Sequence, residues 1–220
     1  MDVAKYLNKN FPTVELRPSL FDQWDISIHF SLGKGIYQFK DHYILNLKRF
    51  KTVYMQTLAL FNELFSPEDD LVLVTNIYCR KNRKNISSFQ VYQPNLKDKK
   101  LLKHLQVKTY PYPFEADNRN LLEMQQFSLR CQVKDLLIER LLKATVHEDF
   151  PLKPRFKVDD IHYPDIFFVN MTRNIIFFVY DDRGCEVIAK TIDRLRPLYD
   201  KYYDWIEDVD RERIEIKLEL

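Results

Sequence analysis

Three apolar runs separated by two short polar segments form the clearest pattern of hydrophobic and polar positions in this chain. The runs cover residues 166–169, 175–180 and 185–189, and the segments 170–174 and 181–184 separate them. β-Branched and aromatic residues favour strands, whereas short segments rich in Asn, Asp and Gly favour turns. Because these strands are apolar on both faces, the pattern predicts a meander that lies at the centre of the fold.

Further strands are predicted from alternating apolar and polar residues or from short apolar runs. Residues 24–32 and 124–133 alternate with a period of two, which is typical of a strand with one buried face. The run 71–79 is mostly apolar, and residues 107–114 contain two prolines that favour extended geometry in the residues before them. Together with the meander, these segments predict a sheet of several strands.

Apolar residues spaced three and four positions apart predict the helices. The longest helix is predicted over 42–65, which contains neither Gly nor Pro and has one apolar face. Shorter helices are predicted over residues 3–11, 97–105, 134–147 and 190–208. The tail 211–220 alternates Ile and Leu with charged residues, which fits either a last edge strand or a frayed helix.

The order of these segments indicates the fold class. Strands and helices do not alternate strictly along the chain, so the pattern predicts an α+β fold with a mainly antiparallel sheet. The long amphipathic helix and a C-terminal helix are expected to pack on this sheet. A length of 220 residues fits one large domain or two small ones, and we expect a single α+β domain over residues 1–220.

The composition is that of a globular protein and limits its chemistry. Hydrophobic residues make up 45% of the chain, and a count of only three Gly argues against Gly-rich phosphate-binding loops. Three isolated cysteines without a Cys-x-x-Cys pair argue against a thiolate zinc site and predict buried free thiols. The N-terminus has no signal-peptide pattern, and no run approaches the roughly 20 apolar residues of a membrane span. We therefore expect a cytoplasmic protein without membrane contact.

A basic segment interrupts an otherwise acidic chain. Residues 80–108 contain nine Lys and Arg residues and one acid, Asp98. Cations neutralise phosphates and aromatic rings stack on bases, so this segment is a candidate nucleic-acid-binding region. Its candidate residues are Arg80, Lys81, Arg83, Lys84, Tyr92, Lys99 and Lys100. The segment equally fits a solvated face, or a mobile loop that meets an acidic protein.

The polar turn Asp181-Asp182-Arg183-Gly184 has two interpretations. As a structural turn, it uses Asp at the early turn positions and places Gly184 in a left-handed conformation. As a functional site, Asp181, Asp182 and Arg183 form a charged docking point for a partner at the end of the sheet. Both interpretations place the turn directly against the core.

No residues form a recognisable catalytic motif. Asp181 and Asp182 could hold a divalent ion only with further oxygen ligands, which the spacing does not provide. A nuclease-like pattern, Pro164-Asp165 with Glu215-Ile216-Lys217, is short enough to arise by chance. The five histidines show no metal-ligand spacing. We therefore predict a protein that is not an enzyme and that has no metal site and no cofactor.

Several segments resemble a known family. The run Phe-Val-Tyr-Asp-Asp-Arg-Gly-Cys-Glu-Val-Ile-Ala at 178–189, with residues 195–199, 204–206 and 16–26, is similar to a family of small uncharacterised bacterial proteins, a domain of unknown function. The similarity spans nearly the whole chain. It implies a bacterial, cytoplasmic, single-domain protein and carries over no catalytic residues. Small bacterial proteins of this kind often resemble immunity proteins of toxin systems.

The leading functional hypothesis is a non-enzymatic protein-binding module, of the immunity type that neutralises a bacterial toxin. It rests on the missing catalytic motif, on the separated charge, and on 16 Phe and 13 Tyr residues, since aromatic residues often anchor interfaces. The expected partner is another protein, in this case a toxin. The alternative is a nucleic-acid-binding protein that uses residues 80–108. The sequence leaves the oligomeric state open.

Overall fold

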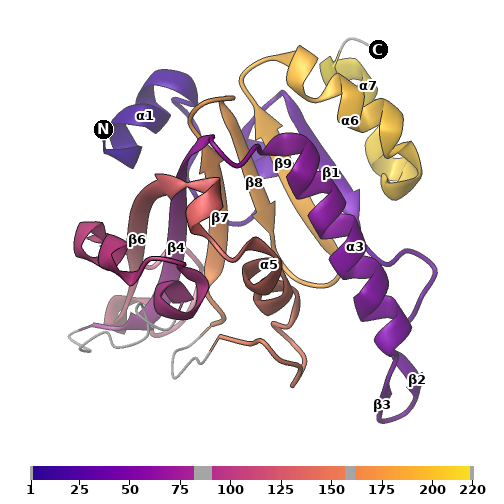
Figure 1. Cartoon of the computed structure of the whole chain (residues 1–220), viewed down its shortest axis with the longest axis horizontal. Helices are drawn as coiled ribbons and strands as arrows, with labels where there is room; N and C mark the ends of the chain where they lie inside the picture. The colour runs from indigo at the N-terminus through magenta and orange to yellow at the C-terminus, as the bar shows by residue number, and fades with distance from the viewer. Residues whose placement is uncertain (1, 82–90, 157–161, 219–220) are drawn as a thin grey trace.

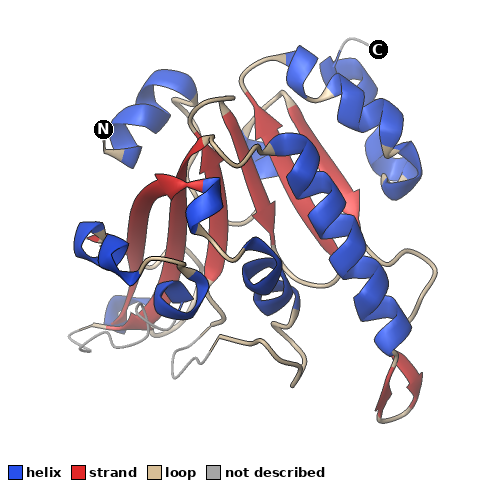
Figure 2. Cartoon of the chain, viewed as in Figure 1, coloured by secondary structure: helices blue, strands red, loops and turns tan. Residues whose placement is uncertain are grey.

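A seven-stranded sheet forms the centre of the computed structural model, which describes residues 2–81, 91–156 and 162–218. In their order across the sheet, the strands are β1 (Ser27–Ser31), β9 (Gly184–Ala189), β8 (Ile175–Val179), β7 (Asp165–Asn170), β4 (Asp70–Arg80), β6 (Leu122–Gln132) and β5 (Gln106–Pro111). Every neighbouring pair is antiparallel (Figure 2). The predicted α+β class with a mainly antiparallel sheet is confirmed.

The predicted meander occupies the middle of this sheet as β7, β8 and β9. Every residue of β8 and β9 is buried, because side chains from other segments cover both faces of these strands. Phe167 and Phe178 lie opposite each other in register, and their rings stack at 4.5 Å. In the turn between β7 and β8, Asn174 adopts a φ of 53°, which its short polar side chain tolerates.

Two helices, α3 (Leu47–Leu64) and α5 (Ile138–Val146), cover one face of the sheet (Figure 1). Their apolar sides join the larger of the hydrophobic clusters. Within it, Phe61 stacks on Phe65 at 4.2 Å and meets Phe168 of β7 edge-to-face at 5.3 Å. Aromatic pairs of this geometry stabilise a core beyond the burial of their area alone.

The N-terminal segment covers part of the opposite face. The helices α1 (Val3–Asn10) and α2 (Leu20–Gln23) and the irregular segment between them form a second hydrophobic cluster with the sheet. Asp2 caps α1 by accepting a hydrogen bond from the backbone N of Ala4 at 3.2 Å. Asn76 of β4 donates to the carbonyl oxygen of Leu16 at 2.6 Å, which fixes the irregular segment on the sheet.

The last two helices, α6 (Arg196–Lys201) and α7 (Asp208–Leu218), lie beside β1 (Figure 1). Of the apolar residues of α7, Ile214 and Leu218 are buried, whereas Val209 and Ile216 are exposed. Polar contacts hold its exposed side: His29 Nδ1 lies 2.8 Å from Asp210 Oδ2. The described part of the tail is therefore helical, which is the second of the two predicted alternatives.

Several predicted boundaries are wrong. The helix predicted over 42–65 begins only at Leu47, because β2 (Phe39–Asp41) and β3 (Ile44–Leu45) pair as a hairpin. The helix predicted from residue 134 begins at Ile138, after a short 3₁₀ helix. The strand predicted over 24–32 is shorter in the structure, where β1 covers only Ser27–Ser31.

Six short 3₁₀ helices connect the larger elements in the described residues. They are η1 (Gln93–Asn95), η2 (Lys99–His104), η3 (Arg119–Leu121), η4 (Val133–Asp135), η5 (Ile192–Arg194) and η6 (Tyr203–Trp205). The helical turns predicted over 97–105 are thus present as η2. Among the helices described, none is both long and apolar enough to cross a membrane.

Candidate functional site

The predicted docking turn follows β8, and its Asp182 forms a buried ion pair with Arg49 of α3. The side chain of Asp182 is only 2% exposed, and that of Arg49, in the first turn of α3, is 7% exposed. Arg49 Nε donates to Asp182 Oδ2 at 2.5 Å. Removing either side chain would leave a buried charge without its partner, so we assign this pair a structural role.

The other guanidinium hydrogens of Arg49 bind backbone carbonyl oxygens. Nη1 donates to Gly33 at 2.8 Å and to Ile36 at 2.6 Å, and Nη2 donates to the carbonyl oxygen of Asp182 at 2.9 Å. Gly33 has a φ of 63°, and a Cβ there would lie 2.7 Å from Arg49 Nη1, so glycine is required at this position. Arg49 therefore joins α3, the turn after β8 and the loop after β1.

Gly184 has a different role from the predicted one. It belongs to the extended strand β9 and does not adopt a left-handed conformation, so that prediction is wrong. A Cβ on Gly184 would lie 2.0 Å from Tyr180 Oη and 2.8 Å from the carbonyl oxygen of Phe30. Glycine fits here because the Tyr180 ring and the backbone of β1 approach it closely.

The carboxylate of Asp181 accepts hydrogen bonds from Arg183 within the turn. Its side chain is 5% exposed, and Oδ1 accepts a hydrogen bond from the backbone N of Arg183 at 2.6 Å. Arg183 Nε donates to Asp181 Oδ2 at 2.7 Å. Asp181 and Asp182 are thus inaccessible to a partner in this structure, which removes the basis of their predicted docking role. Arg183 stays a predicted contact residue, because its side chain is 63% exposed.

An exposed apolar surface lies where the sequence predicted a helix. The β2–β3 hairpin projects from the body of the molecule beyond the start of α3 (Figure 1). We define the hairpin patch as Tyr37, Phe39, Tyr43, Ile44 and Leu47. Tyr43 is 93% exposed, and even Phe39, the least exposed of the five, is 46% exposed. Large apolar side chains exposed together in this way mark binding surfaces.

Hydrogen bonds and one aromatic contact fix the hairpin at its root. The backbone N of Asn46 donates to the carbonyl oxygen of Gln38 at 2.7 Å, and its side-chain amide donates to that of Tyr37 at 3.1 Å. The ring of Phe39 lies 6.0 Å from the ring of Phe150 on the body. These contacts hold one conformation of the hairpin against the rest of the molecule.

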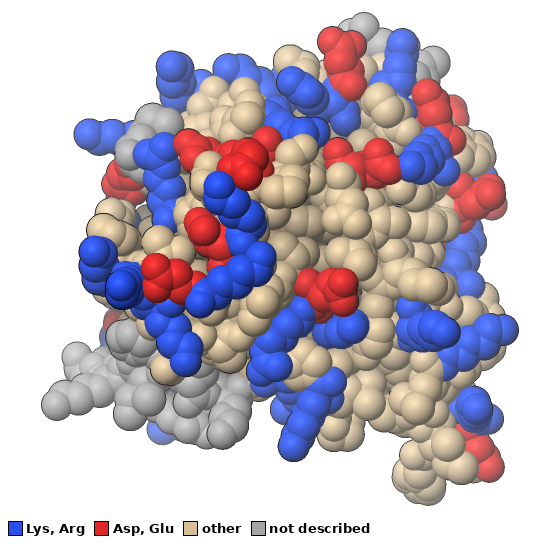
Figure 3. Space-filling view, viewed as in Figure 1, with Lys and Arg blue, Asp and Glu red and all other residues tan. Residues whose placement is uncertain are grey.

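Basic residues surround the hairpin patch. The exposed cations of residues 34–51 are Lys34, Lys40, Lys48 and Lys51, and the exposed acid among them is Asp41. Lys34 is paired with Glu207 at 3.3 Å. Figure 3 shows the hairpin as a largely uncharged projection at lower right, with basic side chains where it meets the body. The surface thus combines an apolar tip with a positively charged base.

The basic segment 80–108 is only partly described. Its candidate residues Arg80, Lys81, Lys99 and Lys100 are exposed. Arg83 and Lys84 lie outside the described residues. The exposed positions stay candidates for contacts with an anionic partner.

Tyr92 cannot stack on a nucleic-acid base, so its predicted role is wrong. The side chain is completely buried, and its hydroxyl lies 3.2 Å from the carbonyl oxygen of Leu73 and 3.1 Å from that of Phe127. Burial raises the pKa of Tyr92 well above its usual value. The residue belongs to the core between the sheet and η1.

Two arginines lie near Lys99 in space although they are distant from it in the sequence. An open depression of about 600 Å³ is lined by Lys99, Arg140 of α5 and Arg155, and no acidic residue is among the described residues that line it. The remaining lining residues are Gln93, Pro94, Leu96 and Leu137. This basic depression becomes visible only in the tertiary structure.

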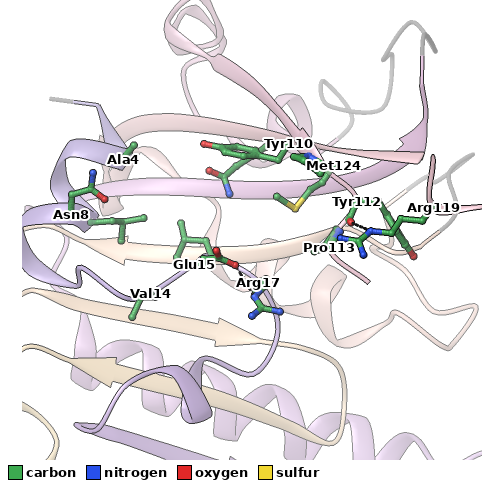
Figure 4. Close-up of a pocket in the computed structure, with 14 residues that line it drawn as sticks. Ala4, Asn8, Val14, Glu15, Arg17, Tyr110, Tyr112, Pro113, Arg119 and Met124 are labelled. Atoms are coloured by element: carbon green, nitrogen blue, oxygen red, sulfur yellow. Dashed lines mark hydrogen bonds and ion pairs between the residues drawn. The ribbon is translucent and has the colours of Figure 1, made fainter. Parts of the chain in front are cut away.

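A pocket of about 490 Å³ lies between α1 and the β5–β6 edge of the sheet (Figure 4). Its lining comprises Ala4, Leu7 and Asn8 of α1, residues 14–17, residues 110–113, and Arg119, Met124 and Gln126. The Gln126 amide donates to Asn76 Oδ1 at 3.0 Å, so the polar part of the floor is fixed by the sheet. The pocket combines apolar and aromatic walls with a few polar groups.

A half-buried carboxyl group lies near the tyrosine end of this pocket. The hydroxyl of Tyr78 donates to Asp165 Oδ2, and burial raises the pKa of Asp165 to about 7. The ring of Tyr112, which lines the pocket, meets the ring of Tyr78 edge-to-face at 5.9 Å. The Tyr112 hydroxyl lies 2.6 Å from His162 Nε2.

The residues of the nuclease-like pattern are not assembled. Asp165 is in β7, whereas Glu215 and Lys217 are on α7 beside β1, and β8 and β9 lie between these strands. Tyr199 donates to Glu215 at 2.5 Å. Within residues 2–81, 91–156 and 162–218, no group of three or more His, Cys, Asp or Glu side chains is placed to hold a metal ion.

Comparison with known proteins places the chain in a family. Residues 3–210 match the family described as a domain of unknown function, DUF3885. The chain belongs to this family. It is 54% identical over 209 residues to the uncharacterised protein YnaE of Bacillus subtilis, a match that covers 94% of this chain and 98% of the relative. No solved structure matches the chain.

The family match includes every surface described above. The predicted resemblance to a small uncharacterised family is confirmed. The DUF3885 range 3–210 contains the hairpin patch, the Arg49–Asp182 pair, the basic depression and the pocket. These features therefore lie within the domain that defines the family.

Proposed function

We propose that this DUF3885 protein is a non-enzymatic module that binds another protein through the hairpin patch. The observation that carries the proposal is the exposure of five large apolar side chains on and beside one projecting hairpin. Contiguous exposed apolar patches mark interaction sites. Tyrosines anchor interfaces well, because a large ring is placed with little loss of side-chain entropy.

The fixed root of the hairpin supports this role. Arg49 holds the carbonyl oxygen of Ile36, immediately before the patch, and is itself held by Asp182. A preorganised surface loses less conformational freedom on binding than a free loop. The conspicuous turn after β8 thus contributes to binding by supporting the hairpin.

The charge around the patch indicates an acidic partner. Three exposed lysines, Lys40, Lys48 and Lys51, stand against one exposed acid, Asp41, and a fourth, Lys34, is paired with Glu207 at 3.3 Å. Opposite charge speeds association and orients the partner, while apolar contacts slow dissociation. The partner we propose presents an apolar cleft bordered by Asp and Glu residues.

In the immunity form of this proposal, the partner is a bacterial toxin whose active surface the hairpin masks. Production of the protein should then protect cells from a toxin encoded beside its gene. A cytoplasmic location is part of the same proposal. It is supported by Cys131 and Cys185, which are buried free thiols of the kind found in reducing compartments.

The test uses the full-length protein and two variants of exposed residues. Tyr43→Ser with Ile44→Ser removes the tip of the patch, and Val209→Ser removes an 86% exposed side chain on α7 as the control. A stoichiometric partner is captured from the native lysate and identified, and its Kd is measured by calorimetry with the purified partner. We expect the hairpin variant to weaken binding at least about tenfold and the control to bind as the wild type does.

Two results would overturn the proposal. The first is an identified partner that binds the hairpin variant as tightly as the wild type. The second is turnover of a substrate by the purified protein at a rate that the hairpin variant retains.

A second candidate function, binding of nucleic acid, is favoured by the basic depression. Lys99, Arg140 and Arg155 surround one open surface without an acid in its described lining. Binding there should weaken steeply with salt, with a log–log slope of about −0.9 for each phosphate contact. Lys99→Gln with Arg140→Gln should lower the slope by about two, and Arg194→Gln on η5 should leave it unchanged. Absence of binding to single- and double-stranded DNA and RNA at low salt would exclude this function.

A further inference from the structure

We infer that the pocket between α1 and the β5–β6 edge binds a small molecule that carries one anionic group on a flat apolar body. This inference is independent of the proposed protein partner. It rests on the volume of the pocket, on the composition of its walls and on two arginines whose acidic partners are exposed.

The volume and the walls fit a small organic molecule. About 490 Å³ lies within the range of ordinary ligand pockets. One end is lined by Ala4 and Asn8 of α1, and the other by Tyr112 and Pro113 (Figure 4). Tyr110 of β5 lines the pocket, and a flat molecule can pack against its partly exposed ring.

Arg17 and Arg119 supply the positive charge. Arg17 Nε lies 3.0 Å from Glu15 Oε2, and the Glu15 side chain, which also lines the pocket, is 74% exposed. Arg119 Nη1 lies 3.3 Å from Glu115 Oε1, and the Glu115 side chain is 96% exposed. Exposed ion pairs contribute little stability, so both guanidinium groups can exchange these partners for a ligand anion.

Arg119 is also positioned by the backbone. Its Nε donates to the carbonyl oxygen of Tyr112 at 3.2 Å, which holds the guanidinium group in the lining of the pocket. A guanidinium group presents paired donors that match a carboxylate, phosphate or sulfonate. Because Leu7, Val14 and Met124 line the pocket as well, a bare inorganic anion would leave most of its surface without contacts.

The floor is polar and fixed. Gln126 is 9% exposed, and its amide nitrogen is bonded to Asn76, which in turn holds the carbonyl oxygen of Leu16. The pocket therefore keeps its shape without a ligand, because the segment bearing Arg17 is tied to the sheet. A preformed pocket of this kind binds without a large ordering cost.

The test measures binding of 8-anilinonaphthalene-1-sulfonate, a flat aromatic sulfonate, to the full-length protein by fluorescence. All proteins carry Tyr43→Ser and Ile44→Ser, which removes the exposed tip of the hairpin patch as a second apolar site for the dye. We expect one saturable site, and a Kd raised about tenfold by Arg119→Gln or Arg17→Gln. The control Arg194→Gln on η5, which does not line the pocket, should leave the Kd unchanged. N-phenyl-1-naphthylamine, which lacks the sulfonate, should bind the arginine variants as it binds their parent.

Two bulky substitutions locate the site. Ala4→Trp and Asn8→Trp each place a large ring in one end of the pocket from the surface of α1, and each should abolish saturable binding. Circular dichroism and the melting temperature identify which of the two remains folded. An unchanged Kd in both arginine variants, or full binding by a folded Trp variant, would overturn the inference. Equal loss of the charged and uncharged dyes in the arginine variants would also overturn the assignment of an anion site.

Discussion

Arg49 and Asp182 lie 133 positions apart in the chain and form a buried ion pair that joins the start of α3 to the turn after β8. The same guanidinium group binds three backbone carbonyl oxygens within 2.9 Å, from Gly33, Ile36 and Asp182 itself. All of these contacts converge just before the exposed hairpin. The pair therefore links the most conspicuous turn of the sequence to the most exposed apolar surface of the structure.

Breaking this pair should strongly destabilise the protein. Arg49→Met leaves the buried Asp182 carboxylate without its cation, and loss of one partner of a buried pair typically costs about 3–5 kcal/mol. Arg49→Lys keeps the charge but cannot reach all the carbonyl oxygens, so an intermediate loss is expected. Urea unfolding monitored by circular dichroism measures the free energy of unfolding.

The exposed pair of Arg130 with Asp70 provides the control. Its side chains are 52% and 43% exposed, so Arg130→Met should cost less than about 1 kcal/mol. Equal losses in the free energy of unfolding for Arg49→Met and Arg130→Met would show that burial does not increase the contribution of Arg49 to stability.

Gly184 should tolerate no larger side chain, for steric reasons. Gly184→Ala places a Cβ 2.8 Å from the fixed carbonyl oxygen of Phe30 and closer still to Tyr180 Oη, so we expect a loss of about 1–3 kcal/mol in the free energy of unfolding. Gly35 supplies the contrast: its φ is 75°, but a Cβ added there would have no other atom within 4 Å. Gly35→Ala should therefore cost only the left-handed penalty of about 1 kcal/mol.

A double variant separates the two explanations for Gly184. In a Tyr180→Ala background, Gly184→Ala should lose less stability than in the wild type, because the closest contact has been removed. The same loss in both backgrounds would mean that the Tyr180 ring moves away without cost and that only the backbone contact matters.

The sequence predicts the strands of the meander but not the role of Gly184. The three strands were predictable, because uninterrupted runs of Ile, Val and Phe satisfy only strands buried on both faces. The role of Gly184 was not, since it depends on a tyrosine ring and on a strand that begins near residue 27. The position of a turn is a local property, whereas the reason for its glycine is a tertiary one.

The hairpin and the two binding surfaces were missed for the same physical reason. Residues 42–46 contain no Gly or Pro, so nothing local separates them from α3. The helix begins only at Leu47 because Asn46, just before it, donates hydrogen bonds to the carbonyl oxygens of Tyr37 and Gln38. The basic depression and the pocket likewise depend on segments that meet only when the sheet forms. Tyr92 was assigned to the surface because its neighbours are basic, although its own hydroxyl bonds hold it in the core.

Stability should fall as the pH rises through the neutral range. Burial raises the pKa of Asp165 to about 7 and that of Glu148 to about 8, so both carboxyl groups keep their protons in the folded state at pH values where the unfolded chain has lost them. The unfolded state then binds fewer protons, and the free energy of unfolding decreases between about pH 4 and pH 8. Asp165→Asn should reduce this decrease, because the amide has no proton to lose.

Tyr78→Phe should change the pH dependence of the free energy of unfolding in the opposite direction from Asp165→Asn. The Tyr78 hydroxyl donates to the ionised Asp165, and its loss raises the pKa of this carboxyl further. The decrease in stability should therefore extend to higher pH and become larger in total, as measured by urea unfolding at a series of pH values. A pH dependence that is identical in the wild type and in Asp165→Asn would show that Asp165 ionises normally in the folded protein.

Removing the tip of the hairpin patch should leave the fold intact. Tyr43 is 93% and Ile44 62% exposed, so Tyr43→Ser with Ile44→Ser gives up little buried area and should change the free energy of unfolding by less than about 0.5 kcal/mol. Phe39→Ser is the matched comparison, because the Phe39 ring contacts Phe150 and is only 46% exposed. It should cost about 1–2 kcal/mol from lost apolar burial. If the tip variant proved as destabilised as Phe39→Ser, the tip would be packed against the body in solution, and the hairpin patch would not be a free surface for a partner.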